Sequence, residues 1–277
     1  MIAGSLCDGD LYNLTRVSRY MAAIGCPKYL HRKGIDLSSR RFSLTVRGEG
    51  FKALRMWRQS PDFSAVPILF CEFDFLDVNQ VVLEMQWLRK FVKSFPLGSR
   101  PIFDHVCLNN FETGKLEHCL ELLRTVNETG CHAITATGLT FEDAHTDAWI
   151  TQMEREVDGK ILLEGLQELS LENCQLSPYQ WMNFLSKLHI PSLCELTIAG
   201  ETSMEAVYHF LCQHPLIRVL HLQCTVEDVP PSSCRLRLPL LRSLCGSSSQ
   251  ILHLLQSLTL LPYLDKLAIE CDSLTPL

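Results

Sequence analysis

A short apolar pattern recurs along the second half of the chain and limits how it can fold. In residues 166–176, LQELSLENCQL, apolar side chains stand at relative positions 1, 4, 6 and 11, with a cysteine at 9. In an extended segment Leu169 and Leu171 point to one side and Ser170 to the other. The 1-4-6 spacing gives five copies, 23 to 27 residues apart, which start at Leu166, Leu193, Ile217, Leu241 and Leu264. Chance matches in a leucine-rich chain do not explain this near-constant spacing.

Each copy predicts a strand followed by a helix. Ser177 is placed to cap a helix, Pro178 suits its first position, Gln180 completes a capping box, and Pro191 stops the helix. Such a unit cannot bury both of its apolar faces alone, so it requires stacked neighbours. The pattern resembles the leucine-rich repeat. This resemblance implies an α/β solenoid with a curved parallel sheet inside and helices outside.

The region before residue 166 carries a less regular form of the pattern. Four more strands are expected there on these core residues: Leu44 and Val46; Phe70, Phe73 and Phe75; Phe103, Val106 and Leu108; Cys131, Ile134 and Ala136. Apolar spacing predicts helices over 81–95 and 116–123, the second capped by Thr113, and Thr202 with Glu205 predicts a later capping box. The repeat domain therefore covers 39–277, with irregular copies over 39–165 and clear copies over 166–277.

Residues 1–38 lie outside the repeat and predict a short all-helical segment. Apolar residues spaced by three and four from Leu14 to Ile24 indicate an amphipathic helix that Gly25 ends, and Pro27 then opens a second helical turn. The stretch from Leu6 to Leu30, above all its Leu-x-x-Val-Ser-Arg core at 14–19, resembles the later part of an F-box, the small helical module that docks on a Skp-type adaptor. The opening Leu-Pro-x-Glu segment of that family has no counterpart in this sequence.

The F-box resemblance implies which residues contact the adaptor. By match to the module these are Leu11, Leu14, Val17, Met21, Pro27 and Leu30. A helical cap that closes the first apolar layer of the solenoid is the alternative interpretation of this segment. Because the opening motif is missing and no polar helix follows the last copy, we expect the sequence to be a fragment of a longer family member.

Composition narrows the classes of partner and compartment. The balance of 25 Lys and Arg against 31 Asp and Glu gives a net charge of −6, which argues against nucleic acid. Thirteen cysteines without a Cys-x-x-Cys pair favour reduced, buried thiols. No apolar run approaches the roughly 18 residues that span a membrane, and the start lacks the pattern of an export signal. We expect a cytoplasmic or nuclear protein without a membrane partner.

Motifs for catalysis are missing from the sequence. It contains no Gly-rich phosphate loop, no Gly-x-Ser-x-Gly elbow, no His-Glu-x-x-His and no dinucleotide fingerprint. The segment 143–147, Asp-Ala-His-Thr-Asp, fits either a divalent metal or the acidic first turn of a helix, and the second fit is favoured. The neighbours Cys131-His132 and His118-Cys119 lack a third partner. The sequence therefore predicts no enzyme, no cofactor and no metal.

Side chains between the core positions are predicted to line the open, concave side of the sheet. Those we assign to partner binding are Glu168, Ser170, Glu172, Glu195, Thr197, His221, Gln223 and Glu270. The same face would hold Glu72, Asp74, His105, Cys107, Thr135, Lys266 and Ala268. Six of these fifteen residues are carboxylates and only Lys266 is a fixed cation, so a target protein with a basic segment is expected. A merely solvated strand face is the alternative.

Together the two resemblances imply a substrate receptor of a Skp-cullin-F-box ubiquitin ligase. Its helices would hold the adaptor and its repeats the target, and it would contribute proximity and no bond chemistry. A leucine-rich-repeat scaffold without a link to ubiquitin is the alternative function.

Overall fold

The fold is built on one large sheet whose strands follow the order of the chain. The computed structural model describes residues 6–33, 35–37, 43–59, 67–73, 78–95, 103–110, 112–113, 115–141, 160–225, 235–258 and 261–269. Its main sheet has ten strands, which are β1 (Ile35–Leu37), β2 (Ser43–Arg47), β3 (Ile68–Glu72), β4 (His105–Asn109), β6 (Ala133–Thr137), β9 (Glu168–Glu172), β11 (Glu195–Glu201), β12 (Val219–Thr225), β13 (Ser243–Gly246) and β14 (Lys266–Ile269). Strand β1 pairs antiparallel with β2, and the other nine run parallel.

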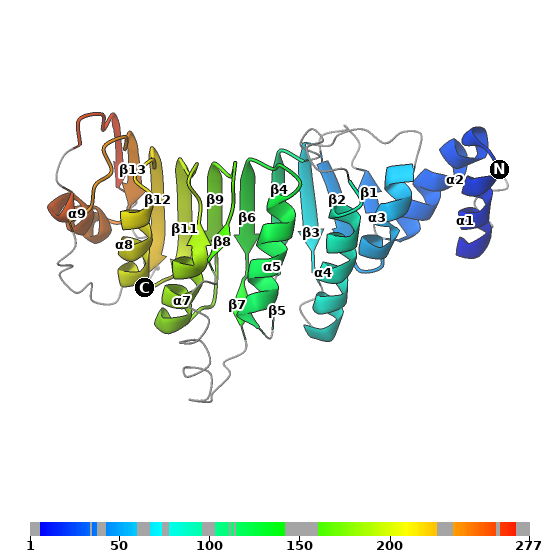
Figure 1. Cartoon of the computed structure of the whole chain (residues 1–277), viewed down its shortest axis with the longest axis horizontal. Helices are drawn as coiled ribbons and strands as arrows, with labels where there is room; N and C mark the ends of the chain where they lie inside the picture. Colours follow the sequence, from blue (N-terminus) through cyan, green and yellow to red (C-terminus); the bar gives the residue numbers. More distant parts are fainter. Residues whose placement is uncertain are drawn as a thin grey trace, which may run out of the picture.

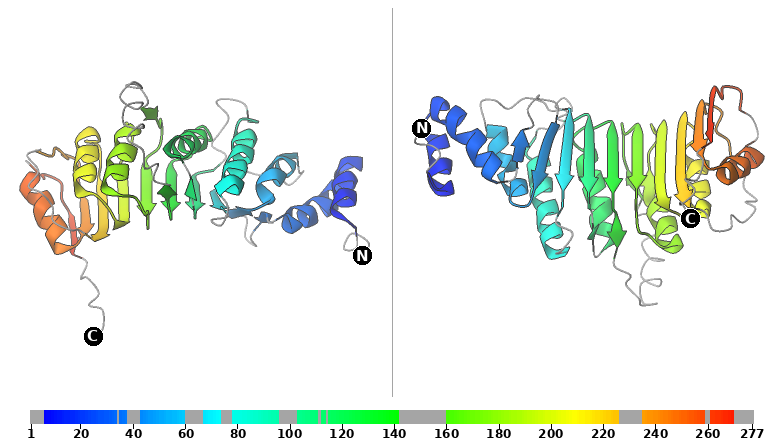
Figure 2. Two further views of the ribbon diagram at one scale, coloured as in Figure 1. Left: turned by 90° about the horizontal axis from the view of Figure 1, so that it is seen from below. Right: turned by 180° about the vertical axis from the view of Figure 1, so that it is seen from behind.

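Helices connect the parallel strands along one side of the sheet. The two N-terminal helices are α1 (Asp8–Val17) and α2 (Arg19–Arg32); the connecting ones are α3 (Gly50–Gln59), α4 (Val78–Val92), α5 (Leu116–Asn127), α7 (Pro178–Lys187), α8 (Met204–Gln213) and α9 (Ser248–Ser257). Helices α3 to α9 follow an arc along the same face of the sheet (Figures 1 and 2). Within the described ranges, no helix covers the other face. We call this uncovered side the open face.

Two short strand pairs lie outside the main sheet. They join β5 (Glu112–Thr113) to β7 (Thr140–Phe141) and β8 (Ile161–Leu162) to β10 (Leu188–His189), both in parallel. The prediction of an α/β chain with a large parallel sheet and outer helices is therefore confirmed. None of the described helices is both long and apolar enough to cross a membrane.

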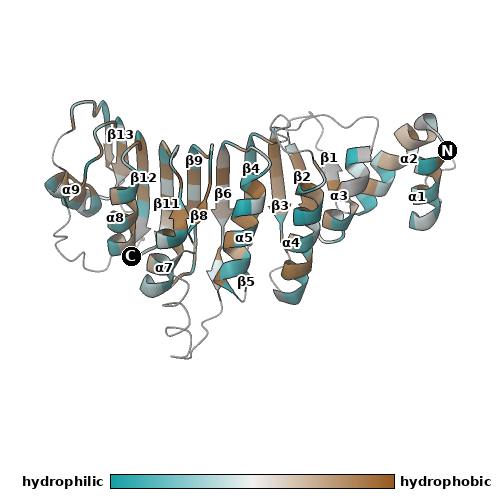
Figure 3. Cartoon of the chain, viewed as in Figure 1, coloured by the Kyte–Doolittle hydropathy of each residue, from teal (hydrophilic) through white to brown (hydrophobic). Residues whose placement is uncertain are grey.

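The register of the strands aligns the five predicted copies. Leu169 pairs with Leu196, then Leu220, Leu244 and Leu267 follow on successive strands. The first four are buried, because the helices cover them, whereas Leu267 is 50% exposed. Colouring by hydropathy shows hydrophobic and hydrophilic residues alternating on several strands and as stripes on the helices (Figure 3). Burial of these rows is the main source of stability in such a layered core.

Four neighbouring strands each carry a residue with positive φ at the same level. These are Asn110 (φ 54°), Gly138 (φ 69°), Asn173 (φ 50°) and Gly200 (φ 103°). Each backbone N–H of the first three donates to a carbonyl on the next strand, for example Asn173 N–H to Ala199 O at 2.8 Å. Because Asn and Gly tolerate the left-handed region best, their recurrence lets the chain leave the sheet in the same way in each layer.

The prediction for one early strand is partly wrong. Of the residues that we expected in the core, Phe73 is buried at 3% exposed, but Phe70 points to the open face, where it is partly buried, and β3 instead buries Leu69 and Cys71. The run Ile-Leu-Phe-Cys-Glu-Phe at 68–73 is apolar at five of six positions, so alternation alone permits either placement. Pairing of Leu69 with Val106 and of Cys71 with Leu108 decides between them. Phe75 lies outside the described residues.

Helix caps agree with the sequence at one site and differ at two. At α7 the capping box is confirmed: Gln180 N–H donates to Ser177 Oγ at 3.3 Å, and Ser177 N–H donates to Gln180 Oε1 at 2.7 Å. Thr113 belongs to β5 and does not cap α5. Helix α8 is capped by Ser203, whose Oγ accepts from Ala206 N–H at 3.4 Å, and not by Thr202.

The N-terminal helices divide at a different residue from the one predicted. Helix α1 ends at Val17, and α2 continues without a break through Gly25 and Pro27. The break falls at Ser18, whose backbone is extended and whose Oγ accepts from Met21 N–H at 3.2 Å. A Cβ at Gly25 would lie 3.2 Å from Thr15 Cγ2, so this glycine permits close packing of α2 on α1.

Candidate protein-binding surfaces

The open face presents its side chains in rows that cross the strands. Ser170, Thr197 and His221 occupy paired positions on β9, β11 and β12, and all three are partly buried. Glu168 pairs in the same way with Glu195, and both are exposed. The predicted surface is therefore a continuous area over three neighbouring strands. Gln223 on β12 is also exposed, whereas Glu270 and Asp74 lie outside the described residues.

Negative charge collects at the centre of this face. Glu168 and Glu195 stand side by side, and Glu172 lies four residues beyond Glu168 on β9, where its Oε1 accepts from Ser170 Oγ at 2.8 Å. None of the ion pairs among the described residues involves these three carboxylates. Like charges at paired positions repel each other, so a cation brought to this area is favoured.

A polar cluster lies beside the carboxylates on β4 and β6. His105 Nε2 is 2.9 Å from Thr135 Oγ1 and 3.5 Å from Cys107 Sγ. Burial lowers the pKa of His105, with Glu168 opposing the shift, and burial raises the pKa of Cys107 to about 11. The imidazole and the thiol are therefore neutral at physiological pH, and this pair lacks the thiolate that a cysteine nucleophile requires.

Several side chains of the open face were not predicted, and three of them change its character. Ile68 and Phe70 on β3 are partly buried and form an apolar area, which the misplaced strand had hidden. Arg47 at the end of β2 alternates with the buried Leu44 and Val46 and is exposed. Lys266 is thus not the one fixed cation of this face, because Arg47 is a second. Both lie far from Glu168 and Glu195, on strands toward the two ends of the sheet.

The other cysteine–histidine neighbours are not arranged for nucleophilic chemistry. Cys131 and Cys119 are both about 1% exposed, and burial raises the pKa of Cys131 to about 12 and that of Cys119 well above its usual value. His132 is exposed. Within the part of the chain that the structure describes, no three His, Cys, Asp or Glu side chains gather as metal ligands. The segment 143–147 lies outside that part.

The six residues assigned to adaptor contact divide into buried and exposed groups. Leu11 is 0% and Leu30 1% exposed, so these two pack inside the N-terminal helices and do not form a surface. Their assignment as contact residues is corrected on this ground. Leu14 is partly buried, and Val17, Met21 and Pro27 are exposed.

Two further apolar side chains extend this exposed group. Tyr20 is 73% and Ile24 38% exposed, beside Val17 at 73% and Met21 at 36%. Tyr20, Ile24 and Pro27 follow helical spacing along one side of α2. We define Val17, Tyr20, Met21 and Ile24 as the N-terminal apolar patch.

An ion-pair network anchors these helices to the repeat region. Lys33 Nζ lies 2.9 Å from Asp8 Oδ2 at the start of α1 and 2.5 Å from Glu49 Oε2 next to α3. The Glu49 and Asp8 carboxylates raise the pKa of Lys33. These ion pairs therefore join the helices that carry the patch to the start of α3.

Because comparison with known proteins gives no match, the functional argument rests on the surfaces described above. No family model matches the chain, and no curated protein matches it either.

Proposed function

We propose that this chain is a leucine-rich-repeat solenoid that acts as a non-catalytic protein-interaction module and binds a target protein on its open face. One observation supports this most: parallel strands run in continuous register, and no helix among the described residues covers one face of their sheet. A face of this size, with polar and apolar side chains in aligned rows, suits an extended protein surface better than a small substrate.

The charged and apolar areas of the open face together indicate which side chains the partner presents. The carboxylates of Glu168, Glu172 and Glu195 attract a basic segment. The apolar area of Ile68 and Phe70 lies three strands from Glu168, across β4 and β6, about 14 Å at the usual strand spacing. An extended segment spans that distance with about four residues. The proposed target therefore presents Lys or Arg about four residues from an apolar side chain.

The N-terminal helices supply the second half of the proposed function. The F-box resemblance, together with the exposed N-terminal apolar patch, supports docking on a Skp-type adaptor. The chain would then be the substrate receptor of a Skp-cullin-F-box ubiquitin ligase. Its contribution is to raise the local concentration of the target near the ubiquitin-transferring subunit.

A scaffold of the same architecture without a link to ubiquitin is the second candidate. The burial of Leu30 favours it, because Leu30 belongs to the same core cluster as Ile35 and Leu44 of the first strands, as a helical cap requires. The two candidates share the open face and differ only at the N-terminal apolar patch.

Adaptor binding separates these candidates. Purified full chain is titrated with a purified Skp-type adaptor, and the affinity is compared with that of Val17→Asp/Met21→Asp. Both side chains are exposed, so folding should persist while binding falls at least tenfold. Leu252→Asp is the control, since Leu252 is 57% exposed on α9, away from the patch. Unchanged binding in the double variant, or none in the parent chain, contradicts the ligase function and leaves the scaffold.

The open face is tested with a lysine-rich peptide that contains one Phe. Glu168→Lys/Glu195→Lys should weaken its binding at least tenfold, because two attractive charges become repulsive. Glu117→Lys/Glu205→Lys makes the same change of net charge on helices α5 and α8, where both residues are exposed. Equal losses of affinity in the two double variants would show that net charge alone drives binding. This result would contradict the assignment of peptide binding to the open face.

A further inference from the structure

The outer surface of α3 and α4 is basic, although the chain is acidic as a whole. Exposed or partly exposed cations on these helices and the turn after α4 are Lys52, Arg58, Arg89, Lys90 and Lys93. The sequence of α3 contains no acidic residue, and the only one over 78–95 is Glu84, which is fully buried. Because the whole chain has a net charge of −6, this local excess of positive charge on α3 and α4 is unexpected.

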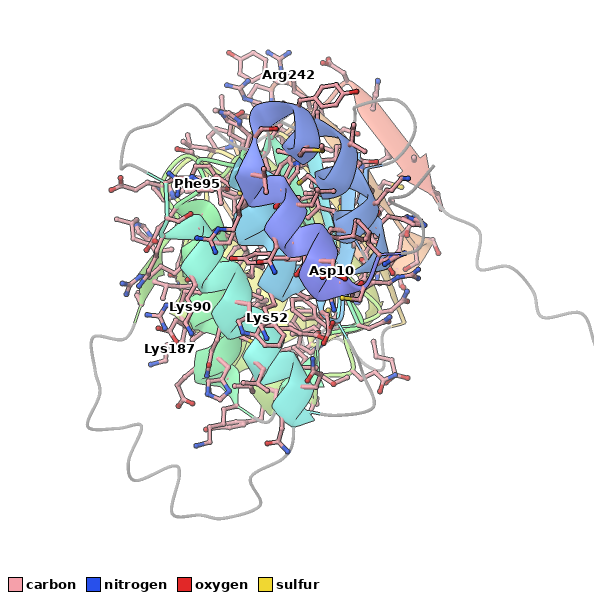
Figure 4. All side chains as sticks on the ribbon, turned by 90° about the vertical axis from the view of Figure 1, so that its right-hand side faces the viewer. Asp10, Lys52, Lys90, Phe95, Lys187 and Arg242 are labelled. Atoms are coloured by element: carbon pink, nitrogen blue, oxygen red, sulfur yellow. The ribbon has the colours of Figure 1, made fainter. Side chains whose placement is uncertain are left out.

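Part of this surface forms a stripe beside a hollow. Gln86, Arg89, Lys90 and Lys93 are spaced by three and four, so they lie on one side of α4. Together with Ser94 they line an open surface hollow of about 440 Å³ on the outer side of α4. In Figure 4, which views the molecule from its N-terminal end, Lys90 lies on the outer flank below Phe95.

A second, smaller hollow continues from the first between α4 and α5. It has a volume of about 110 Å³ and shares Gln86 and Arg89 with the larger one. Its α5 wall includes His118, whose Nδ1 is shielded and has no hydrogen-bond partner among the described atoms. A buried polar atom without a partner is costly, so it indicates a position where a bound group supplies the missing contact.

Arg89 already binds one oxyanion at this site, the carboxylate of Glu121. Its Nη1 pairs with Glu121 Oε1 across the smaller hollow. The Arg89 side chain is 37% and the Glu121 side chain 47% exposed, so the pair contributes at most about 1 kcal/mol. A ligand with greater negative charge can replace Glu121 at little cost.

The helix end by itself does not account for these cations. Basic residues in a last turn offset about half a negative charge of the helix dipole. The carbonyls of Arg89, Phe91 and Val92 already accept backbone N–H groups. Arg58 donates to Ser94 O and lies 4.7 Å over the ring of Phe95, so it adds a further fixed charge beside this turn. The positive charge therefore exceeds what the end of α4 requires.

We propose that the stripe of Gln86, Arg89, Lys90 and Lys93 binds the phosphate groups of a small phosphorylated ligand. Arg89 supplies a planar donor pair for two phosphate oxygens, and the two lysines supply mobile point charges. Gln86 lies at the same hollow and offers an amide donor, whereas the Ser94 hydroxyl already donates to Phe91 O. The site lies on the helix side, away from the open face, and does not depend on the proposed function.

Inorganic pyrophosphate is the probe, titrated calorimetrically into the purified full chain at low ionic strength. Saturable binding to one site is expected, and Lys90→Gln/Lys93→Gln should weaken it at least tenfold. Both lysines are exposed, so this variant keeps its thermal midpoint. Glu121→Gln should bind more tightly than the parent chain, because it removes the carboxylate that competes for Arg89.

Lys187→Gln/Arg242→Gln is the matched control, since it removes two positive charges from other elements: Lys187 ends α7, and Arg242 directly precedes β13. The proposal is overturned if this control loses as much affinity as Lys90→Gln/Lys93→Gln, or if no saturable binding occurs. It is also overturned if a phosphoserine peptide binds in an Arg89-dependent manner while pyrophosphate does not, because the ligand is then a protein.

Discussion

Glu168 and Glu195 occupy paired positions on the adjacent strands β9 and β11, and both carboxylates are exposed on the open face. The ion pairs among the described residues leave both of them out. Two like charges at this spacing reduce stability in the free protein. The arrangement is consistent with a surface selected for a basic partner and not for the stability of the sheet.

Removing one of these charges should therefore stabilise the free chain. Glu195→Gln is expected to raise the free energy of unfolding by about 0.2 to 1 kcal/mol at low salt, and by less at high salt. Glu205→Gln is the matched control, because Glu205 lies in the first turn of α8, where a carboxylate is favourable. Urea unfolding at two salt concentrations checks this. A loss of stability in Glu195→Gln would contradict the repulsion.

The aligned leucine row predicts a graded cost of truncation. Leu196 is 0% exposed in the middle of the row, so Leu196→Ala should lower the free energy of unfolding by about 2 to 5 kcal/mol. Leu267 occupies the same row on β14 but is 50% exposed, and Leu267→Ala should cost less than about 1 kcal/mol. Equal costs in urea unfolding would mean that the row does not form one continuous core.

Substitution of Gly200 is expected to destabilise the protein for two reasons that can be tested separately. Its φ is 103°, and a Cβ there would lie 3.2 Å from Asn173 Cα. Gly200→Ala should therefore lower the free energy of unfolding by about 1 to 3 kcal/mol. In Gly165→Ala the residue also has positive φ, at 82°, but no atom lies within 4 Å of the added Cβ. If Gly165→Ala costs as much in urea unfolding, the close approach of the strands contributes nothing.

His214 links α8 to the segment before β11 and should make stability depend on pH. Its Nδ1–H donates to Phe210 O at 2.8 Å, and its Nε2 accepts from Ile190 N–H at 3.1 Å, so the ring is neutral. Burial lowers its pKa, Phe210 O opposes this shift, and nearby His189 and Lys160 add to it. A histidine in an unfolded chain has a pKa of about 6.5.

It follows that the unfolded chain binds a proton below pH of about 6.5 that the folded chain does not, and stability falls as the pH decreases. The urea midpoint of the parent chain should drop between pH 7.5 and 5, and His214→Gln should flatten this drop. His132→Gln is the control, because His132 is exposed and is not among the groups that shift the pKa of His214. The same pH profile in His214→Gln and the parent chain would exclude His214 as the cause.

The strands and helices of the clear repeats were predictable from the sequence, because the apolar pattern allows only one face of each strand to enter the core. Within β9 only the face with Leu169 and Leu171 is apolar and can enter the core, and Ser177, Pro178 and Gln180 fix the helix start. In the apolar run at 68–73, by contrast, two alternations are possible. The choice of Leu69 and Cys71 depends on pairing with β4, which is a tertiary effect.

Other features depend on contacts that no local pattern encodes. Gly25 and Pro27 read as a helix end, but Ser18 provides the break because its hydroxyl caps α2 and Gly25 packs on α1. Of the candidate binding residues, Glu168, Ser170, Glu195 and Thr197 follow from strand alternation alone. The smaller hollow beside Arg89 depends on how α4 packs on α5, so spacing within α4 predicts the stripe but not this hollow.

The most direct test of the account is carboxyl footprinting of the full chain with and without the lysine-rich peptide. Water-soluble carbodiimide and an amine label exposed carboxylates, and mass spectrometry measures the rate at each site. Bound peptide should slow labelling of Glu168 and Glu195 and leave Glu117 and Glu205, exposed on the helix side, unchanged. Equal slowing at all four sites, or slowing only at Glu117 and Glu205, would contradict the open face as the binding surface.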